Sequence, residues 1–194
     1  MVVNPANPQT GQRLTAEAFR ALPENNAVVM QHIDGVMYVD SPVYAHQEIL
    51  LRAAILLNAI APHGRTVIAP MDVYLDEDTC QPDVFWVGSE SACQLRPDGK
   101  WQGPPDLIIE ILSPSTAVVD RRLKFDLYER QGVAEYWLVD ILADAYFVEV
   151  YANRDGVYER VGVFLSGDMF PSTVLGQPIA AARILGDQAG AQSA

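Results

Sequence analysis

The most marked apolar pattern in the chain lies in residues 103–132, GPPDLIIEILSPSTAVVDRRLKFDLYERQG. Its apolar run over residues 106–112 predicts a buried strand, which the following Ser-Pro pair ends. A helix is expected from about residue 116 to residue 131, with Gly132 as its C-cap. The sequence EYWLVD over residues 135–140 predicts a further buried strand. A strand, a helix and a strand in this order favour two parallel strands with a right-handed crossover.

Periodic segments on both sides of this unit predict the other helices and strands. Before it, the expected elements are a helix over residues 14–22 capped by Thr15, strands over 27–30 and 36–39 around the turn pair Asp34-Gly35, and a long helix from Ser41-Pro42 to about Ile60. Between that helix and the unit, strands are expected over 65–75 and 82–87, followed by a polar loop over 88–105. After the unit, residues 145–151 and 157–164 predict a hairpin.

This order of elements predicts an α+β (α/β) fold. The mixed central sheet is flanked by two main helices, and hairpin strands are added at the N-terminal and C-terminal sides. The length of 194 residues suits one domain, expected over residues 1–186, and residues 187–194 (DQAGAQSA) are expected to be a disordered tail. No glycine-rich phosphate loop follows a strand, which argues against a dinucleotide-binding fold.

Composition and charge restrict the possible surroundings of the chain. No apolar run reaches the roughly 18 residues of a membrane span, and no secretory signal is visible. Cys80 and Cys93 lack metal-binding spacing and are expected to be free thiols, which fits a cytoplasmic location. The net charge of −12 argues against a generally basic surface for nucleic acid, although a nucleic-acid enzyme can keep its basic groups local.

Two carboxylates on the predicted strand suggest chemistry, because burying an unpaired carboxylate is costly. Asp106 and Glu110 share one face of the strand, since side chains alternate. They lie roughly 13 Å apart at about 3.3 Å per residue, so they cannot both bind one ion. Asp83, at the start of the strand expected over 82–87, is the best partner for Glu110. Such a pair would suit Mg²⁺ or Mn²⁺.

The helix after this strand carries a possible cationic partner. Asp120, Lys124 and Tyr128 are spaced four apart and form one stripe. Lys124 could reach the carboxylates, or it could form an ordinary ion pair with Asp120 on a solvated face. His46 lies in the first turn of the long helix. It could belong to the same site, or it could be a structural histidine bonded to a nearby backbone group, as most such histidines are.

These residues together resemble a known family. The segments PDVFWV, GPPDLIIEILSPST and GVAEYWLVD, with Asp120, Lys124 and Tyr128 between the last two, resemble the Uma-type restriction endonuclease family of the PD-(D/E)XK nuclease superfamily. The likeness extends from LTAEAFRALPE, through SPVYAH with His46, to the hairpin that ends near Phe164.

The resemblance implies a restriction-endonuclease-like core and a set of functional residues. Asp83 and Glu110 match the metal-binding aspartate and glutamate, and Lys124 matches a lysine that positions or activates water. The superfamily lysine usually lies two residues after the glutamate, where this chain has Leu112. His46 and Asp106 also fall on positions of the family pattern. The resemblance also implies a homodimer and a nucleic-acid substrate, for which DNA is the first expectation.

Three functions remain open from the sequence. The first is a Mg²⁺-dependent endonuclease with Asp83, Glu110, Lys124, His46 and Asp106 in its site. The second is a binding or regulatory protein that keeps the nuclease fold without hydrolysis, which the acidic composition favours. The third is a metal-dependent phosphoesterase that acts on small nucleotides.

Overall fold

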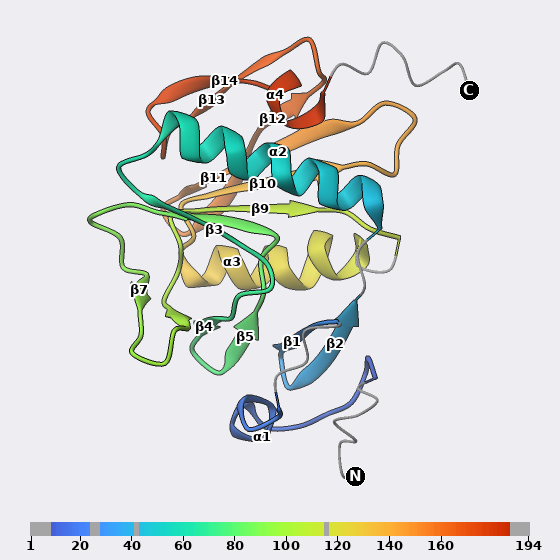
Figure 1. Cartoon of the computed structure of the whole chain (residues 1–194), viewed down its shortest axis with the longest axis vertical. Coiled ribbons are helices and arrows are strands. Elements are labelled where there is room, and N and C mark those ends of the chain that lie inside the picture. Colours follow the sequence, from blue (N-terminus) through green and yellow to red (C-terminus); the bar gives the residue numbers. More distant parts are fainter. Residues whose placement is uncertain (1–8, 24–27, 41–42, 115–116, 187–194) are drawn as a thin grey trace.

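The computed structural model describes residues 9–23, 28–40, 43–114 and 117–186. Its centre is a six-stranded sheet in the order β12-β11-β10-β9-β6-β3 (Figure 1). The strands are β3 (Arg65–Ile68), β6 (Val84–Val87), β9 (Leu107–Ile111), β10 (Glu135–Asp140), β11 (Phe147–Arg154) and β12 (Val157–Phe164).

The two middle strands of this sheet are buried along their whole length, as their apolar sequences predict. β9 and β10 are parallel, with Glu110 opposite Leu138, and this confirms the expected strand-helix-strand unit. On its other side, β9 pairs antiparallel with β6, with Val84 opposite Ile109. The end of β9 therefore lies beside the beginning of β6.

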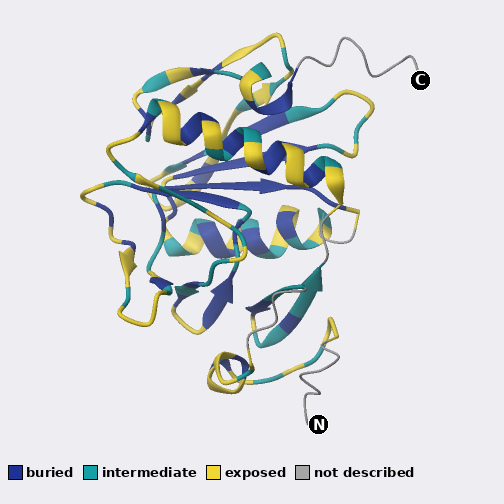
Figure 2. Cartoon of the chain, in the orientation of Figure 1, coloured by how far each residue is buried: buried dark blue, intermediate teal, exposed yellow. Residues whose placement is uncertain are grey.

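One main helix covers each face of the central sheet (Figure 1). α2 (Tyr44–Ile60) packs with its buried stripe on one face. On the other face lies a helix that is π-helical over η1 (Val119–Lys124) and α-helical over α3 (Phe125–Gln131). Gly132 ends α3 at φ 81°, a left-handed conformation that glycine adopts without a steric cost. Figure 2 shows the sheet as the buried layer between two helices that expose only their outer sides.

A second six-stranded sheet, in the order β2-β1-β5-β4-β8-β7, lies at the end of the molecule that also holds α1 (Figure 1). α1 (Ala16–Arg20) begins at Thr15, whose side chain accepts a hydrogen bond from the N–H of Ala18. The strands are β1 (Val29–Ile33), β2 (Val36–Asp40), β4 (Val73–Leu75), β5 (Asp78–Cys80), β7 (Gln94–Leu95) and β8 (Trp101–Gln102). At the opposite end, β13 (Met169–Ser172), β14 (Gln177–Ala180) and α4 (Ala182–Leu185) complete the described chain.

The mixed α+β fold is confirmed, and several element boundaries need correction. The strand expected over residues 65–75 is two strands in different sheets, and the break between them contains Pro70, which has no N–H for a strand ladder. The loop expected over 88–105 contains the short strands β7 and β8, and the strand expected at 27–30 runs over 29–33. Ser41, Pro42, Thr116 and the tail 187–194 lie outside the described residues. None of the described helices is long and apolar enough to cross a membrane.

Candidate active site

A cavity of about 210 Å³ opens where β9 ends and β6 begins. The antiparallel pairing of these strands brings Asp83, just before β6, to the last residues of β9. α2 supplies His46 to the same cavity, and η1 supplies Asp120 and Lys124. The other lining residues are Val28, Val29, Gln31, Asp40, Gln47, Leu50, Ala69, Pro70, Gln81 and Glu110.

Asp83 is held from two sides. Its Oδ2 lies 3.0 Å from Nε2 of His46, and it accepts a hydrogen bond of 2.8 Å from the N–H of Ile111. Burial lowers the pKa of His46, but the hydrogen bond and the negative charge of Asp83 outweigh this effect and raise it. His46 therefore acts as a charged or hydrogen-bonding support that fixes the orientation of this carboxylate.

Glu110 is almost completely buried beside one hydroxyl and one ammonium group. Its Oε1 accepts a hydrogen bond of 2.7 Å from the hydroxyl of Tyr128 and lies 3.0 Å from Nζ of Lys124. Burial raises the pKa of Glu110 to about 8, the charge of Lys124 opposes this rise, and the nearby charges of Asp83 and Asp120 add to it. This carboxyl group therefore holds a proton far more tightly than an ordinary glutamate.

Lys124 is the buried cation of the site. Its Nζ lies 3.0 Å from Glu110 and 3.1 Å from Oδ1 of Asp120, and only 3% of the side chain is exposed. Burial lowers the pKa of this amine, but the charges of Asp120 and Glu110 raise it above its usual value, so Lys124 stays charged. One ammonium thus faces three carboxyl groups, those of Asp83, Glu110 and Asp120, and the negative charges of Asp83 and Asp120 help to raise the pKa of Glu110.

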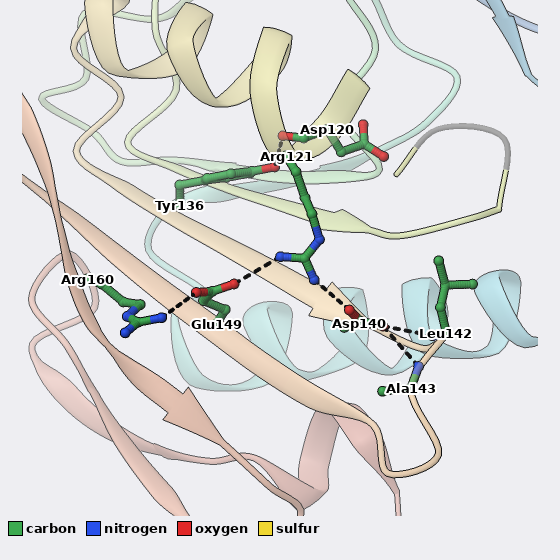
Figure 3. Close-up of polar contacts among 8 residues, drawn as sticks. All are labelled: Asp120, Arg121, Tyr136, Asp140, Leu142, Ala143, Glu149 and Arg160. Carbon is green, nitrogen blue, oxygen red and sulfur yellow. Dashed lines mark hydrogen bonds and ion pairs between the residues drawn. The ribbon is translucent and has the colours of Figure 1, made fainter. Parts of the chain in front are cut away.

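The π-helical turn that carries Asp120 and Lys124 is tied to the sheet on its other side (Figure 3). Arg121 donates 2.5 Å to Asp140 Oδ2 and 3.2 Å to Glu149 Oε2, at β10 and β11. The hydroxyl of Tyr136 donates to the backbone carbonyl of Asp120 at 3.2 Å. The carboxylate of Asp120 points away from Arg121 in Figure 3. Turns of this kind are frequent at functional sites.

The structure brings together Asp83, Glu110, Lys124 and His46, but it does not bring Asp106 to them. Asp106 lines a different cavity, with His63 and Trp86, and its Oδ2 accepts a hydrogen bond of 2.8 Å from the N–H of Gly88. The separation of Asp106 and Glu110 along one strand explains this result. Asp106 thus lies outside the cavity of the other four residues, in contact with the loop at Gly88, and its catalytic role stays a prediction.

Two residues of the cluster were not among the predicted site residues. Asp120 and Tyr128 are both buried and contact Lys124 and Glu110, respectively. The stripe of Asp120, Lys124 and Tyr128 at helical spacing was the available signal, and an exposed ion pair was its alternative explanation. The exposed alternative is wrong, because the stripe faces the carboxylates in the interior.

The residues of the cavity fit a divalent cation in their chemistry. Mg²⁺ is commonly held by one or two carboxylates, with water and substrate phosphate as the other ligands. Within the described residues, no group of three or more His, Cys, Asp or Glu side chains is arranged to hold an ion alone. Asp83 and Glu110 could hold the ion through oxygens that their present contacts do not engage, and the charge of the ion would favour the ionised form of Glu110.

Comparison with known proteins agrees with this geometry. A family model described as "Uma2: Putative restriction endonuclease" matches residues 16–182, which is most of the chain. The chain belongs to the Uma2 family. A crystal structure from Anabaena variabilis ATCC 29413, described as a putative nuclease belonging to DUF820, superimposes on this Uma2 chain with a TM-score of 0.72. It is 18% identical, and the match covers 89% of this chain and 97% of that chain, which shows the shared fold. No curated protein matches the chain.

Proposed function

We propose that this Uma2 chain is a divalent-metal-dependent endonuclease that hydrolyses phosphodiester bonds of nucleic acid, with DNA as the expected substrate. The observation that carries the proposal is the convergence of Asp83, Glu110 and the buried Lys124 in one cavity. Three carboxyl groups, those of Asp83, Glu110 and Asp120, lie around the ammonium of Lys124, and the charges of Asp83 and Asp120 add to the effect of burial in raising the pKa of Glu110. A bound Mg²⁺ or Mn²⁺ would offset this repulsion and favour the ionised form of Glu110.

Each residue has a role that follows from its contacts. Asp83 and Glu110 would hold the cation, and the bound cation would lower the pKa of water and stabilise charge on the scissile phosphate. His46 and the N–H of Ile111 orient the carboxylate of Asp83. Lys124, kept charged by Asp120, would orient the attacking water or neutralise the phosphate.

A cleavage assay tests this proposal directly. Plasmid and oligonucleotide DNA are incubated with Mg²⁺ or Mn²⁺ and with the wild type, Asp83→Ala, Glu110→Ala or Lys124→Ala. We expect metal-dependent cleavage by the wild type and a loss of about 10²-fold or more in each variant. Cleavage that survives all three substitutions would overturn the assignment.

A metal-binding measurement separates this function from its main alternative. The net charge of −12 and Leu112 at the usual lysine position favour a protein that keeps the fold without catalysis. Calorimetry with Mn²⁺ should show binding that Glu110→Ala removes, and a lapsed site should show none. Turnover of small nucleotides faster than polynucleotides would instead indicate a phosphoesterase. Light scattering will test the expected homodimer.

A further inference from the structure

A second cavity, of about 370 Å³, lies next to the candidate active site. The two cavities share three lining residues, Val28, Pro70 and Gln81. The second cavity belongs mainly to α1 and the smaller sheet, which supply Arg20, Tyr74 and Thr79 to its wall. A ligand that extends beyond the carboxylate cluster on this side would enter it.

Arg20 gives this cavity a fixed positive charge. Its Nη2 donates to the backbone carbonyls of Asp76 at 2.8 Å and Asp78 at 3.3 Å, and its Nε donates to the hydroxyl of Thr79 at 3.3 Å. The guanidinium carbon lies 4.5 Å from the centroid of the Tyr74 ring. All of these partners are neutral, and within the described part of the chain Arg20 has no carboxylate partner. The guanidinium is therefore held in place, and none of its contacts with the described residues neutralises its charge.

The acidic residues of the same wall are already paired. Asp72 lies 3.0 Å from Nζ of Lys100, and its other oxygen accepts 2.7 Å from Nε2 of Gln81. Asp98 lies 3.0 Å from Nε of Arg96, whose guanidinium carbon is 5.4 Å from the Tyr74 ring centroid. Among the charged groups that line this cavity in the described part of the chain, Arg20 is therefore the one without an ion-pair partner of opposite charge.

We infer that this second cavity is a phosphate subsite, in which Arg20 binds the nucleic-acid backbone beside the scissile phosphate. The inference rests on the proposed nuclease function and adds the position of the substrate strand. A guanidinium binds phosphate oxygens through parallel N–H donors, and Nη1 of Arg20 carries N–H groups beyond those used at Nε and Nη2. The contact is to the backbone, so it carries no sequence preference.

The salt dependence of binding tests this subsite. A labelled DNA oligonucleotide is titrated by fluorescence anisotropy at several salt concentrations, with Ca²⁺ in place of Mg²⁺. Arg20→Gln removes the charge, and its shorter amide ends near the position of Nε, so it can keep the hydrogen bond to the hydroxyl of Thr79. Loss of one phosphate contact should reduce the slope of log K against log salt by about 1 and weaken binding about tenfold.

Two further variants separate a lost phosphate contact from damage to the fold. Arg20→Lys keeps the charge and should keep the wild-type slope, with somewhat weaker binding. Arg183→Gln removes an exposed arginine from α4, at the opposite end of the molecule from α1, and should change neither quantity (Figure 1). If Arg20→Gln does not fold, the affinity of Arg20→Lys tests the subsite, because an ammonium cannot make the parallel contacts of a guanidinium; unchanged binding would then overturn it.

The possible failures are distinct. Wild-type binding with an unchanged slope in Arg20→Gln would overturn the phosphate subsite and leave the nuclease proposal intact. An equal loss of slope in Arg183→Gln would also overturn it, because the effect would then be general. No nucleic-acid binding by the wild type would overturn both proposals.

Discussion

Glu110 and Glu135 lie on neighbouring parallel strands of the central sheet, and each has only 1% of its surface exposed. Glu110 faces a cavity, an ammonium group and other carboxylates. Glu135 instead accepts hydrogen bonds from neutral donors: Trp137 Nε1 at 2.6 Å, Thr173 N at 2.9 Å, Thr173 Oγ1 at 3.1 Å, Val174 N at 3.1 Å and Ser172 Oγ at 3.2 Å. Burial of an acid in an apolar strand therefore does not identify a catalytic group. Its neighbours do.

The largest expected effect is on cleavage activity, which should distinguish Glu110 from Glu135. Glu110→Gln should lower metal-dependent cleavage by about 10³-fold, because an amide is a poor ligand and carries no charge for the cation. Glu135→Gln should retain most of its activity per folded molecule. Single-turnover cleavage rates, scaled to the folded fraction from circular dichroism, measure both. Equal losses in the two variants would remove the functional distinction.

The free energy of unfolding should distinguish the two glutamates in the opposite order, with the larger loss in Glu135→Gln. In Glu135→Gln, an NH₂ group faces the N–H and O–H donors of residues 172–174, and we expect a loss of about 3 kcal/mol in the free energy of unfolding. Urea unfolding curves at neutral pH measure this loss. Glu159→Gln, on an exposed position of β12, is the matched control and should change stability by less than about 0.5 kcal/mol. A loss in Glu135→Gln no larger than in this control would contradict the proposed role as a polar anchor.

The pH dependence of stability should distinguish Glu110 further. The pKa of Glu110 is raised from 4.5 to about 8 on folding, so the unfolded state releases its proton first as the pH rises. Wild-type stability should therefore fall between these pH values relative to Glu110→Gln, by on the order of 4 kcal/mol. Urea unfolding of both proteins at pH 5 and pH 8, without divalent ions, measures the change. Parallel pH profiles would show that Glu110 does not hold the extra proton.

The smallest expected effect concerns the support of the π-helical turn. Arg121→Gln should lower the cleavage rate about tenfold with little change in KM, because Asp120 and Lys124 lose their fixed position. Arg160→Gln is the control, since Arg160 also contacts Glu149, at 3.3 Å, but belongs to β12. Steady-state kinetics of both variants provide the comparison. Similar losses in both would assign the effect to Glu149 and the sheet.

Much of the fold could be predicted because its central elements have clear local patterns. The apolar runs around Glu110 and Glu135 predicted β9 and β10, and the glycine at 132 predicted the end of α3. Strand geometry also showed that Asp106 and Glu110 cannot share an ion, which pointed to Asp83. Short strands such as β7 and β8 carry too few residues for a periodic signal.

The candidate site was less predictable, because its surroundings depend on long-range packing. The spacing of Asp120 and Lys124 gave their ion pair, but it could not show whether the pair faced water or the interior. The sequence likewise could not separate Glu110 from Glu135, since the donors to Glu135 come from residues 172–174. The assignment of catalytic roles to Asp83, Glu110, Lys124 and His46 stays a prediction.

The contacts of Arg121 with β10 and β11 also set when the site can reach its full geometry during synthesis of the chain. The cluster joins His46, Asp83, Glu110 and Lys124, and β10 and β11, which hold Asp140 and Glu149, secure its helix. A nascent chain that ends before β11 has every cluster residue but lacks the Glu149 contact that helps to fix the π-helical turn. On the proposed function, the nascent chain would thus become a fully competent nuclease only after β11 has been synthesised and has paired with β10.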